Sequence, residues 1–235
     1  MNLVRNSLDW LIDPSQWQGE DSLAALLGEQ LLYTFVAVGL AALVSVPLGW
    51  WIGHSGRGRD IAVAITGMAR AVPSFGLLIL LVLLFGVLHK PEAALLTFVL
   101  LAIPPILAGS YTGFQAIDRR TLDAARAMGM SELQVMAKVE IPLGLPLLVG
   151  GLRSAMLQVV ATVTIAAYVN LGGLGLPIIS GLNLRRYDMV LGAALLVAML
   201  ALTIDLVMGL IQKMSVPGGL LRGTRFIVDP KDGIH

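Results

Sequence analysis

The chain has 235 residues, of which 57% are hydrophobic and 13% charged, and its mean hydropathy is +0.83. Soluble domains are usually about 45–50% apolar and about 25% charged, so this composition excludes a typical soluble enzyme, a nucleic-acid-binding domain and a disordered chain. The net charge of +1 indicates no charged partner, and the lack of cysteine excludes disulfides, thiolate metal sites and cysteine nucleophiles. The composition predicts an integral membrane protein.

The N-terminal segment shows no cleavable secretion signal, because its apolar stretch is short and no small-residue cleavage site follows. We expect residues 1–22 to form an external or interfacial segment, with Trp10 and Trp17 at the membrane surface. A transmembrane domain is expected at residues 23–213 and a cytoplasmic tail at residues 214–235.

Within the transmembrane domain, five apolar runs are long enough to cross about 30 Å of hydrocarbon as helices. The runs are continuous rather than alternating, which favours an all-α polytopic protein over an outer-membrane barrel. The predicted spans are Leu23–Ile52, Ile61–Leu88, Glu92–Phe114, Leu143–Val169 and Met189–Gln212. We expect kinks or breaks at Pro73, Pro104 and Pro105, and the sequence also allows a sixth short span at residues 170–183.

Basic residues orient these spans. With the N-terminus outside, ten Lys and Arg residues lie in the inner segments, four lie in the outer segments and two lie within spans. Cytoplasmic loops carry an excess of positive charge, so this distribution places the long loop 115–142 and the C-terminus in the cytoplasm. The expected location is a cell membrane, inner or plasma, which the chain crosses several times.

The long cytoplasmic loop has the pattern of two short helices joined by a tight turn. The first helix is predicted at about Arg119–Met128, and Gly129 suits the left-handed position that follows a helix C-terminus. Ser131 and Gln134 form the capping-box pattern that starts a second helix, and Pro142 is expected to end that helix. The alternative interpretation is that this stretch is an ordinary surface loop.

The spacing of this loop resembles the EAA loop of ABC importer permeases, which reads Glu-Ala-Ala, three residues, Gly, nine residues and Ile-x-Leu-Pro. Here Asp123-Ala124-Ala125 is followed at the same spacings by Gly129 and by Val139-Glu140-Ile141-Pro142. In that family the loop forms a coupling helix that docks on a cytoplasmic ATPase. The resemblance therefore implies an ATPase-coupling motif that ends at Pro142. The residues implied to face the ATPase are Asp123, Ala124, Ala125, Met128 and Gly129.

Other segments are similar to osmoprotectant importers for glycine betaine, choline and carnitine. They include Pro47-Leu48-Gly49, Pro73-Ser74-Phe75 and the stretch from Gly172-Gly173-Leu174-Gly175 to Asp205. The resemblance implies the type I ABC importer permease fold, a second permease subunit that is identical or similar, and an external substrate-binding protein. It also implies that ATP and magnesium bind a partner ATPase dimer and that this chain carries no cofactor.

Motifs for covalent chemistry are absent from the sequence. There is no Gly-x4-Gly-Lys-Ser/Thr loop for nucleotide phosphates, no His-Glu-x-x-His and no Gly-x-Ser-x-Gly. The three histidines are scattered, which argues against a histidine metal site. We therefore expect no enzyme activity on this chain. The external glycines Gly172, Gly173 and Gly175 are expected to form a close-packed turn rather than a nucleotide loop.

Three ionisable residues fall inside predicted spans, where each costs at least a few kcal/mol and is a functional candidate. Arg70, Arg153 and Asp205 are expected to meet in the inner half of the bundle. With Pro73 and Ser74 they would belong to the translocation or gating region. The alternative is an ion pair that only holds helices together, or arginines that reach the headgroups. Arg70 also departs from the similar importers, which often carry Gln near this position.

The sequence therefore predicts the permease subunit of an ATP-driven importer for quaternary-ammonium osmoprotectants. An ion-gradient-driven secondary transporter, with Asp205 as the coupling carboxylate, is the alternative, although the five spans show no convincing inverted repeat. A membrane scaffold without transport is weaker, because it gives no reason for charges at membrane depth. The sequence leaves open which osmolyte is carried and whether the permease is a homodimer or a heterodimer.

Overall fold

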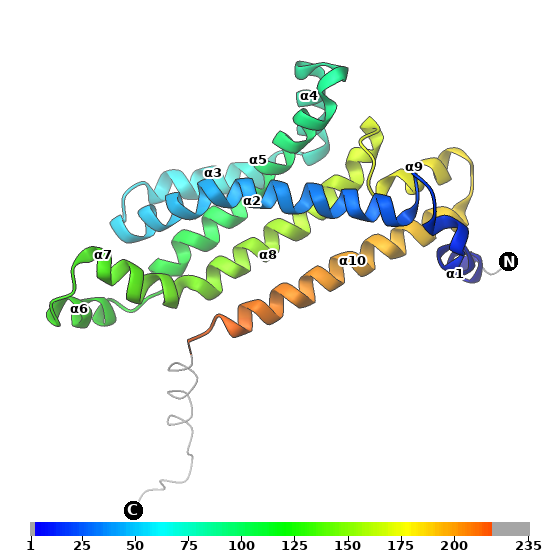
Figure 1. Ribbon diagram of the computed structural model, residues 1–235. Coiled ribbons are helices and arrows are strands. Elements are labelled where there is room, and N and C mark those ends of the chain that lie inside the picture. Colours follow the sequence, from blue (N-terminus) through cyan, green and yellow to red (C-terminus); the bar gives the residue numbers. More distant parts are fainter. Residues whose placement is uncertain (1–2, 218–235) are drawn as a thin grey trace, which may run out of the picture.

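The computed structural model describes residues 3–217, without the side chains of residues 65 and 68–71. Regular structure in these residues is entirely helical, which confirms the all-α class (Figure 1). The α-helices are α1 (Leu3–Ile12), α2 (Leu23–Ser55), α3 (Arg59–Ala71), α4 (Ser74–Phe85), α5 (Lys90–Gln115), α6 (Arg119–Ala127), α7 (Glu132–Val135), α8 (Ile141–Ala166), α9 (Gly175–Asn183) and α10 (Tyr187–Met214). Short segments connect some of them, namely η1 (Pro14–Trp17), η2 (Val87–His89), the π-helical η3 (Met136–Glu140) and η4 (Ala167–Val169).

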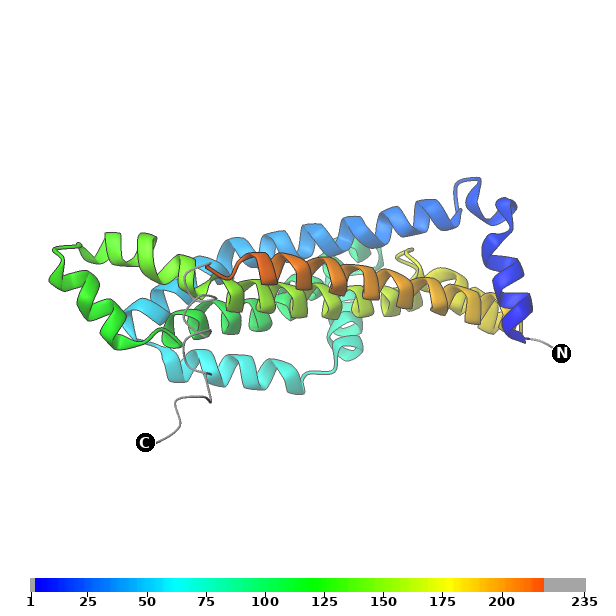
Figure 2. The ribbon, with the colours of Figure 1, turned by 90° about the horizontal axis from the view of Figure 1, so that it is seen from below.

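Four helical segments are long and apolar enough to cross a membrane. They are Leu23–Ser55, Val87–Gln115, Glu132–Val169 and Tyr187–Met214. The second predicted span is instead divided into α3 and α4, as expected for a break at Pro73. Proline disfavours helical backbone at the residue before it, and Val72 is extended with a ψ of 121°. Figure 2 shows α4 leaving the direction of α3 at a steep angle.

The arrangement of the helices agrees with a chain that crosses the membrane an odd number of times. α1 lies at one end of the bundle, together with α9 and the start of α10 (Figure 1). α10 finishes at the opposite end, where α6 and α7 are also found (Figure 1). If α6 and α7 are cytoplasmic, as the basic residues predict, the N-terminal segment is external.

At Pro104 and Pro105 the helix is not broken, because α5 continues through both prolines to Gln115. Each proline removes one backbone hydrogen bond and crowds the preceding turn. α5 is nevertheless enclosed by α2 and α8, and Ala102 and Ile106 are fully buried. Tertiary packing of this kind retains a helix in which two adjacent hydrogen bonds are missing.

Glycines allow the helices on either side of α5 to approach it at backbone distance. A Cβ atom at Gly109 of α5 would lie 2.6 Å from the carbonyl oxygen of Leu147, and one at Gly113 would lie 2.7 Å from that of Gly144. Gly49 of α2 is covered in the same way by the other side of α5. Such small residues are typical of close helix contacts in membranes. α5 is therefore the central helix of the bundle.

α10 is the most peripheral of the long helices. It packs against α8, α9 and α1, but the residues it buries are few, namely Gly192, Ala193, Leu196 and Ile204. Its other side is apolar and exposed, with Leu202 and Leu206 more than two-thirds accessible. Because lipid tails are as apolar as these side chains, this face is suited to the bilayer.

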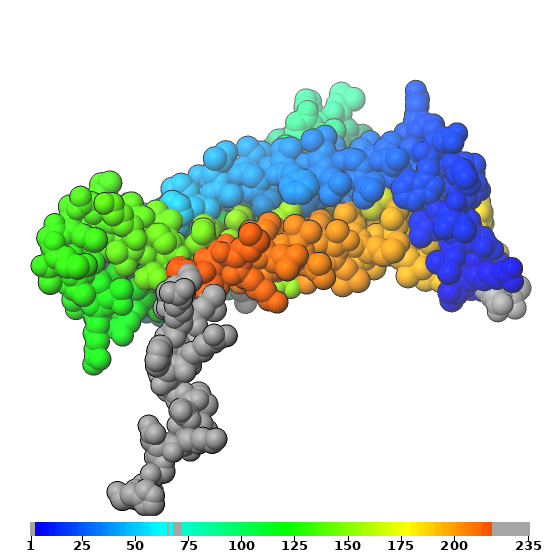
Figure 3. All heavy atoms as spheres, turned by 60° about the horizontal axis from the view of Figure 1, so that its bottom comes forward, coloured from blue at the N-terminus to red at the C-terminus, as the bar shows by residue number. Residues whose placement is uncertain are grey.

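The N-terminal segment packs on the outer end of the bundle (Figure 3). Trp10 of α1 is only 7% exposed, and its ring lies over Gly192 of α10, where a Cβ atom would be 2.5 Å from the ring. The expectation of an interfacial anchor is therefore wrong for Trp10, because Gly192 makes room for its ring within the protein. Trp17 is partly exposed and donates its Nε1–H to the carbonyl of Leu11 over 2.7 Å.

We predict that Gly109→Ala destabilises the protein by about 1–3 kcal/mol, because the new methyl group must push apart the backbones of α5 and α8. Gly39→Ala is the matched control, since nothing lies within 4 Å of a Cβ atom at Gly39. The control is expected to be neutral or slightly stabilising. Thermal unfolding of the purified variants in detergent measures both effects. Equal midpoints for the two variants would contradict the close packing at Gly109.

Candidate functional site

α6 and α7 form a helical elbow, residues 119–135, which projects beyond the inner ends of the spans (Figure 3). Gly129 follows the end of α6 with a φ of +83°. Its N–H donates to the carbonyl of Arg126, and the N–H of Met130 donates to the carbonyl of Ala125. These two bonds make a Schellman cap, in which glycine tolerates the left-handed conformation. The predicted left-handed position of Gly129 after the helix end is confirmed.

The second helix of the elbow begins with the predicted capping box. The Gln134 N–H donates to the Ser131 hydroxyl over 3.4 Å, and the Ser131 N–H donates to the Gln134 side chain over 3.0 Å. The two caps therefore fix the sharp reversal between α6 and α7 from both sides.

The expected end of this helix at Pro142 is wrong, because helical structure continues from α7 through η3 into α8. In η3 the turns are wider, and the N–H of Ile141 donates to the carbonyl of Met136, five residues earlier. Pro142 has no N–H to donate and lies in the first turn of α8. The π-helical segment accommodates the proline without a break. The elbow is thus joined directly to a membrane-spanning helix.

The elbow surface combines exposed apolar and acidic side chains. Met128 and Leu133 are 73% and 74% exposed, and the carboxylate side chain of Asp123 is also largely exposed. Ala124 is exposed as well, whereas Ala125 is buried at 3%. Ala125 therefore packs inside the elbow and is not on the surface that the resemblance assigned to it. Large apolar side chains that are accessible outside the membrane are typical of binding surfaces.

A chain of polar side chains connects the elbow with α2. Arg126 makes two hydrogen bonds with Glu132, at 2.9 and 3.0 Å, and lies 3.5 Å from Asp123. The hydrogen bond that Arg126 donates to Glu132 raises the pKa of Arg126. His54, near the inner end of α2, has its Nε2 3.7 Å from Glu132 and its Nδ1 hydrogen-bonded to Glu140. The elbow is therefore tied to two helices of the bundle.

The His54–Glu140 contact was not predicted from the sequence. Glu140 is 3% exposed, and a buried carboxylate requires a hydrogen-bonding partner. An acidic residue immediately before an apolar span is a signal that could have been noticed. The partner of Glu140 could not be identified in this way, because His54 is 86 positions away in the sequence.

At the outer end of the bundle, the predicted glycine turn is close-packed. Gly172 and Gly173 have φ values of +99° and +70°. The Gly173 N–H donates to the Glu29 carboxylate over 3.0 Å, and the Leu174 N–H donates to the Gln30 side chain over 3.2 Å. The following helix, α9, has nine residues, which is too short for the sixth span that the sequence allowed.

Gln30 is the polar residue that holds this turn against the spans. It is fully buried, and its amide group donates to the carbonyl of Val160 over 2.8 Å and to the hydroxyl of Thr164 over 3.2 Å. A Cβ atom at Gly175 would clash with the carbonyl of Thr164, so the turn requires glycine there. Polar residues at membrane depth are usually paired, and Gln30 in an apolar run could have been singled out for that reason.

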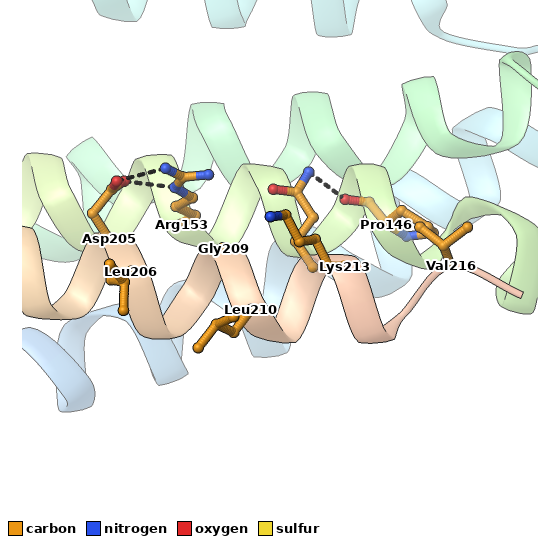
Figure 4. Close-up of a pocket in the computed structure, with 9 residues that line it drawn as sticks. Pro146, Arg153, Asp205, Leu206, Gly209, Leu210, Lys213 and Val216 are labelled. Atoms are coloured by element: carbon orange, nitrogen blue, oxygen red, sulfur yellow. Dashed lines mark hydrogen bonds and ion pairs between the residues drawn. The ribbon is translucent and has the colours of Figure 1, made fainter. Parts of the chain in front are cut away.

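Two of the three charges inside the spans meet (Figure 4). Arg153 of α8 makes two hydrogen bonds of 2.6 Å with Asp205 of α10. They line a cavity of about 520 Å³, and near it Gln212 donates to the carbonyl of Pro146 over 3.0 Å. This geometry fits the alternative in which the pair holds two helices together. The side chain of Arg70 lies outside the described residues.

Pro73 and Ser74 lie at the break between α3 and α4. The carbonyl of Pro73 accepts the N–H of Leu77 over 3.0 Å, so that Pro73 caps α4. The next residue, Phe75, contacts the ring of Tyr168 in η4 at a centroid distance of 5.5 Å. The predicted gating segment is therefore in contact with the outer end of α8.

The sequence pattern of one family, described as the binding-protein-dependent transport system inner membrane component, matches residues 45–218. The chain belongs to this family. It is accordingly a multi-pass transport permease of the membrane and not a catalytic enzyme, and the permease interpretation holds over the ion-gradient-driven secondary transporter.

Individual relatives agree with this assignment. The glycine betaine/carnitine/choline transport system permease protein OpuCB of Bacillus subtilis strain 168 is 31% identical over 82% of this chain and 88% of its own length. The osmoprotectant import permease protein OsmW of Salmonella typhimurium is 32% identical over 84% of this chain and 94% of its own length. A chain of the MetNI methionine ABC transporter in an inward-facing conformation has a TM-score of 0.72 at 21% identity, covering 87% of this chain and 99% of that chain. The fold is thus that of ABC importer permeases.

We predict that Asp205→Ala lowers the midpoint of thermal unfolding by more than Asp188→Ala does, because Arg153 loses its ion-pair partner at membrane depth. Asp188→Ala is the matched control, since it breaks the Arg186–Asp188 pair at the start of α10 and is expected to cost less than about 1 kcal/mol. The double variant Arg153→Asp with Asp205→Arg restores an ion pair and should recover part of the loss. Thermal unfolding checks all three, and an Asp205→Ala variant as stable as the control would refute the prediction.

Proposed function

We propose that this chain is the permease subunit of an ATP-driven importer of quaternary-ammonium osmoprotectants such as glycine betaine, choline or carnitine. Support for the solute class comes from relatives whose names contain these solutes and which match at about 30% identity over most of the chain. Support for the energy source comes from one structural observation. The elbow is a capped, exposed helical reversal joined without interruption to a membrane-spanning helix.

In this proposal the elbow docks on a cytoplasmic ATPase, which binds the ATP and magnesium. Asp123, Ala124, Met128 and Gly129 supply the contact surface, and Ala125 supports it from inside. A second permease subunit, identical or similar, carries a second elbow, and an external substrate-binding protein delivers the solute. Closure of the ATPase dimer brings the two elbows together.

Movement of the elbow reaches the membrane by two routes. One is the continuous helix through η3 into α8, and the other is the polar contact of Glu132 and Glu140 with His54 of α2. These connections would tilt α2 and α8 together when the ATPase closes. The pore then alternates between outward and inward access, with the break at Pro73 and Ser74 as a gating element. The permease performs no covalent chemistry.

The central prediction is that uptake of a quaternary amine requires the ATPase partner and ATP. Proteoliposomes that contain the permease, its ATPase and its binding protein should accumulate radiolabelled glycine betaine or choline when ATP is supplied to the ATPase. Dissipation of ion gradients with ionophores should leave this uptake unchanged. Uptake that persists without the ATPase and collapses with the ion gradient would contradict the proposal. ATP-driven uptake of some other solute class would contradict only the assigned substrate.

We also predict that Gly129→Ala weakens the association between permease and ATPase about fivefold. A side chain at a φ of +83° costs about 1 kcal/mol, which loosens the reversal between α6 and α7. Gly58→Ala is the matched control, because Gly58 is left-handed as well, with a φ of +79°, and only Ile52 is near, at 4.0 Å, but it lies between α2 and α3. Co-purification of the ATPase with each variant measures the effect. If both variants retained the ATPase equally, the elbow would not be the docking element.

A further inference from the structure

Phe75 and Tyr168 form an aromatic pair that is open to the surroundings of the chain. Their rings meet at 63° with centroids 5.5 Å apart, and the two residues are 41% and 61% exposed. Within residues 3–217, the other two aromatic contacts each include a ring that is almost fully buried, Phe98 in one and Phe114 in the other. An edge-to-face contact covers at most one face of one ring, so further ring faces are free to bind a ligand.

The pair lies where the helical backbone is interrupted. α3 ends at Ala71, and its last carbonyl groups have no helical partners. Val72 is 44% exposed and Pro73 is exposed as well. Non-helical backbone at membrane depth is tolerated only where it is buried in protein or lines a water-filled cavity, because lipid cannot hydrogen-bond to it. Since this break is exposed in the subunit, it is suited to an aqueous pathway.

The ring faces at the break favour a cation. The C-terminus of α3 has a partial negative charge, but the N-terminus of α4 lies at the same break with a partial positive charge, so the two helix ends together select neither sign. Aromatic faces attract quaternary ammonium groups through the negative potential above the ring.

The position of Tyr168 is fixed by its neighbours. Ala167 is buried beneath Gly175, where a Cβ atom would lie 2.8 Å from the Ala167 Cβ. Asn170 takes the left-handed conformation with a φ of +57°, and the glycine turn that follows is bonded to Glu29 and Gln30 of α2. Tyr168 is therefore held on a rigid support, as a binding residue requires.

We propose that Phe75 and Tyr168 form a contact site for the quaternary ammonium group of the solute within the permease, at the break between α3 and α4. This inference rests on the proposed function and extends it, because it assigns cation recognition to the membrane subunit as well as to the external binding protein. The ammonium group contacts the free ring faces as the solute passes the break between α3 and α4.

Equilibrium binding to the permease–ATPase complex, purified without the binding protein, tests this site. Radiolabelled choline should bind to the wild-type complex. Unlabelled tetramethylammonium should displace it, whereas the neutral isostere of choline, in which carbon replaces the nitrogen, should not. This comparison needs no variant, so it depends on no mutant protein folding. No detectable choline binding, or equal displacement by the neutral isostere, would overturn the site.

Substitutions then locate the site. Phe75→Leu and Tyr168→Leu should each weaken choline binding about threefold to thirtyfold, because each removes a ring face. Tyr168→Phe retains the ring and should stay within about twofold of the wild type. Phe35→Leu is the matched control, because Phe35 is an exposed ring on α2 for which the structure shows no aromatic partner among the described residues. Co-purification with the ATPase confirms that each variant is assembled.

The outcomes separate this inference from the proposed function. If the wild-type complex shows no ATP-driven uptake of quaternary amines, the proposed function is wrong. If uptake is normal but both leucine variants bind choline as tightly as Phe35→Leu does, the proposed function stands and the aromatic site is wrong.

Discussion

Backbone contact between α5 and its two neighbours is the constraint on which the rest of the bundle depends. Gly109 and Gly113 bring α8 within van der Waals distance of the main chain of α5, and Gly49 does the same for α2. Because apolar side chains gain little by leaving lipid for protein, close approach and the dispersion contacts it permits are the main source of cohesion between membrane helices. α2, α5 and α8 therefore form the closely packed centre of the bundle. The less enclosed elements, α4, α10 and the elbow, are attached to it.

Polar contacts decide how these attached elements are placed. Gln30 joins the outer glycine turn to α2 and α8, the Arg153–Asp205 pair joins α10 to α8, and the His54–Glu140 contact joins the elbow to α2. Each contact satisfies groups that would be costly to leave unpaired near lipid. Their positions also differ along the bundle, so that each end of the molecule has its own specific attachment.

Local structure could be predicted from the sequence where a short pattern determines it. The Schellman cap at Gly129, the capping box at Ser131 and the break at Pro73 each depend on residues within a few positions of one another. At Pro104 and Pro142 the helix continues for the opposite reason, since the packing around α5 and the π-helical segment before Pro142 outweigh the local preference of proline. Trp10 was misplaced because the space for its ring is provided by Gly192, which is distant in the sequence.

The candidate functional site could likewise be predicted from the sequence only in part. The elbow was found from its spacing, and the proximity of Arg153 and Asp205 was expected from their depths in two spans. The contacts of Gln30 and His54 were missed, because they join residues 86 to 144 positions apart. A single sequence marks such residues as polar groups in unusual surroundings but does not identify their partners. For Ala125, the motif gave the correct spacing, whereas only the structure shows that the side chain is inside the elbow.

The continuity of helical structure from Glu132 to Val169 has a mechanical consequence. Its membrane part, the 26 residues of α8, forms a lever arm about 39 Å long, because an α-helix rises about 1.5 Å per residue. Pivoting this arm by about 8° at its cytoplasmic end displaces its far end by about 5.4 Å, the pitch of one helical turn. Tyr168 is located at that far end. A small angular change in the cytosol is therefore amplified into a displacement as large as a solute methylammonium group on the other side of the membrane.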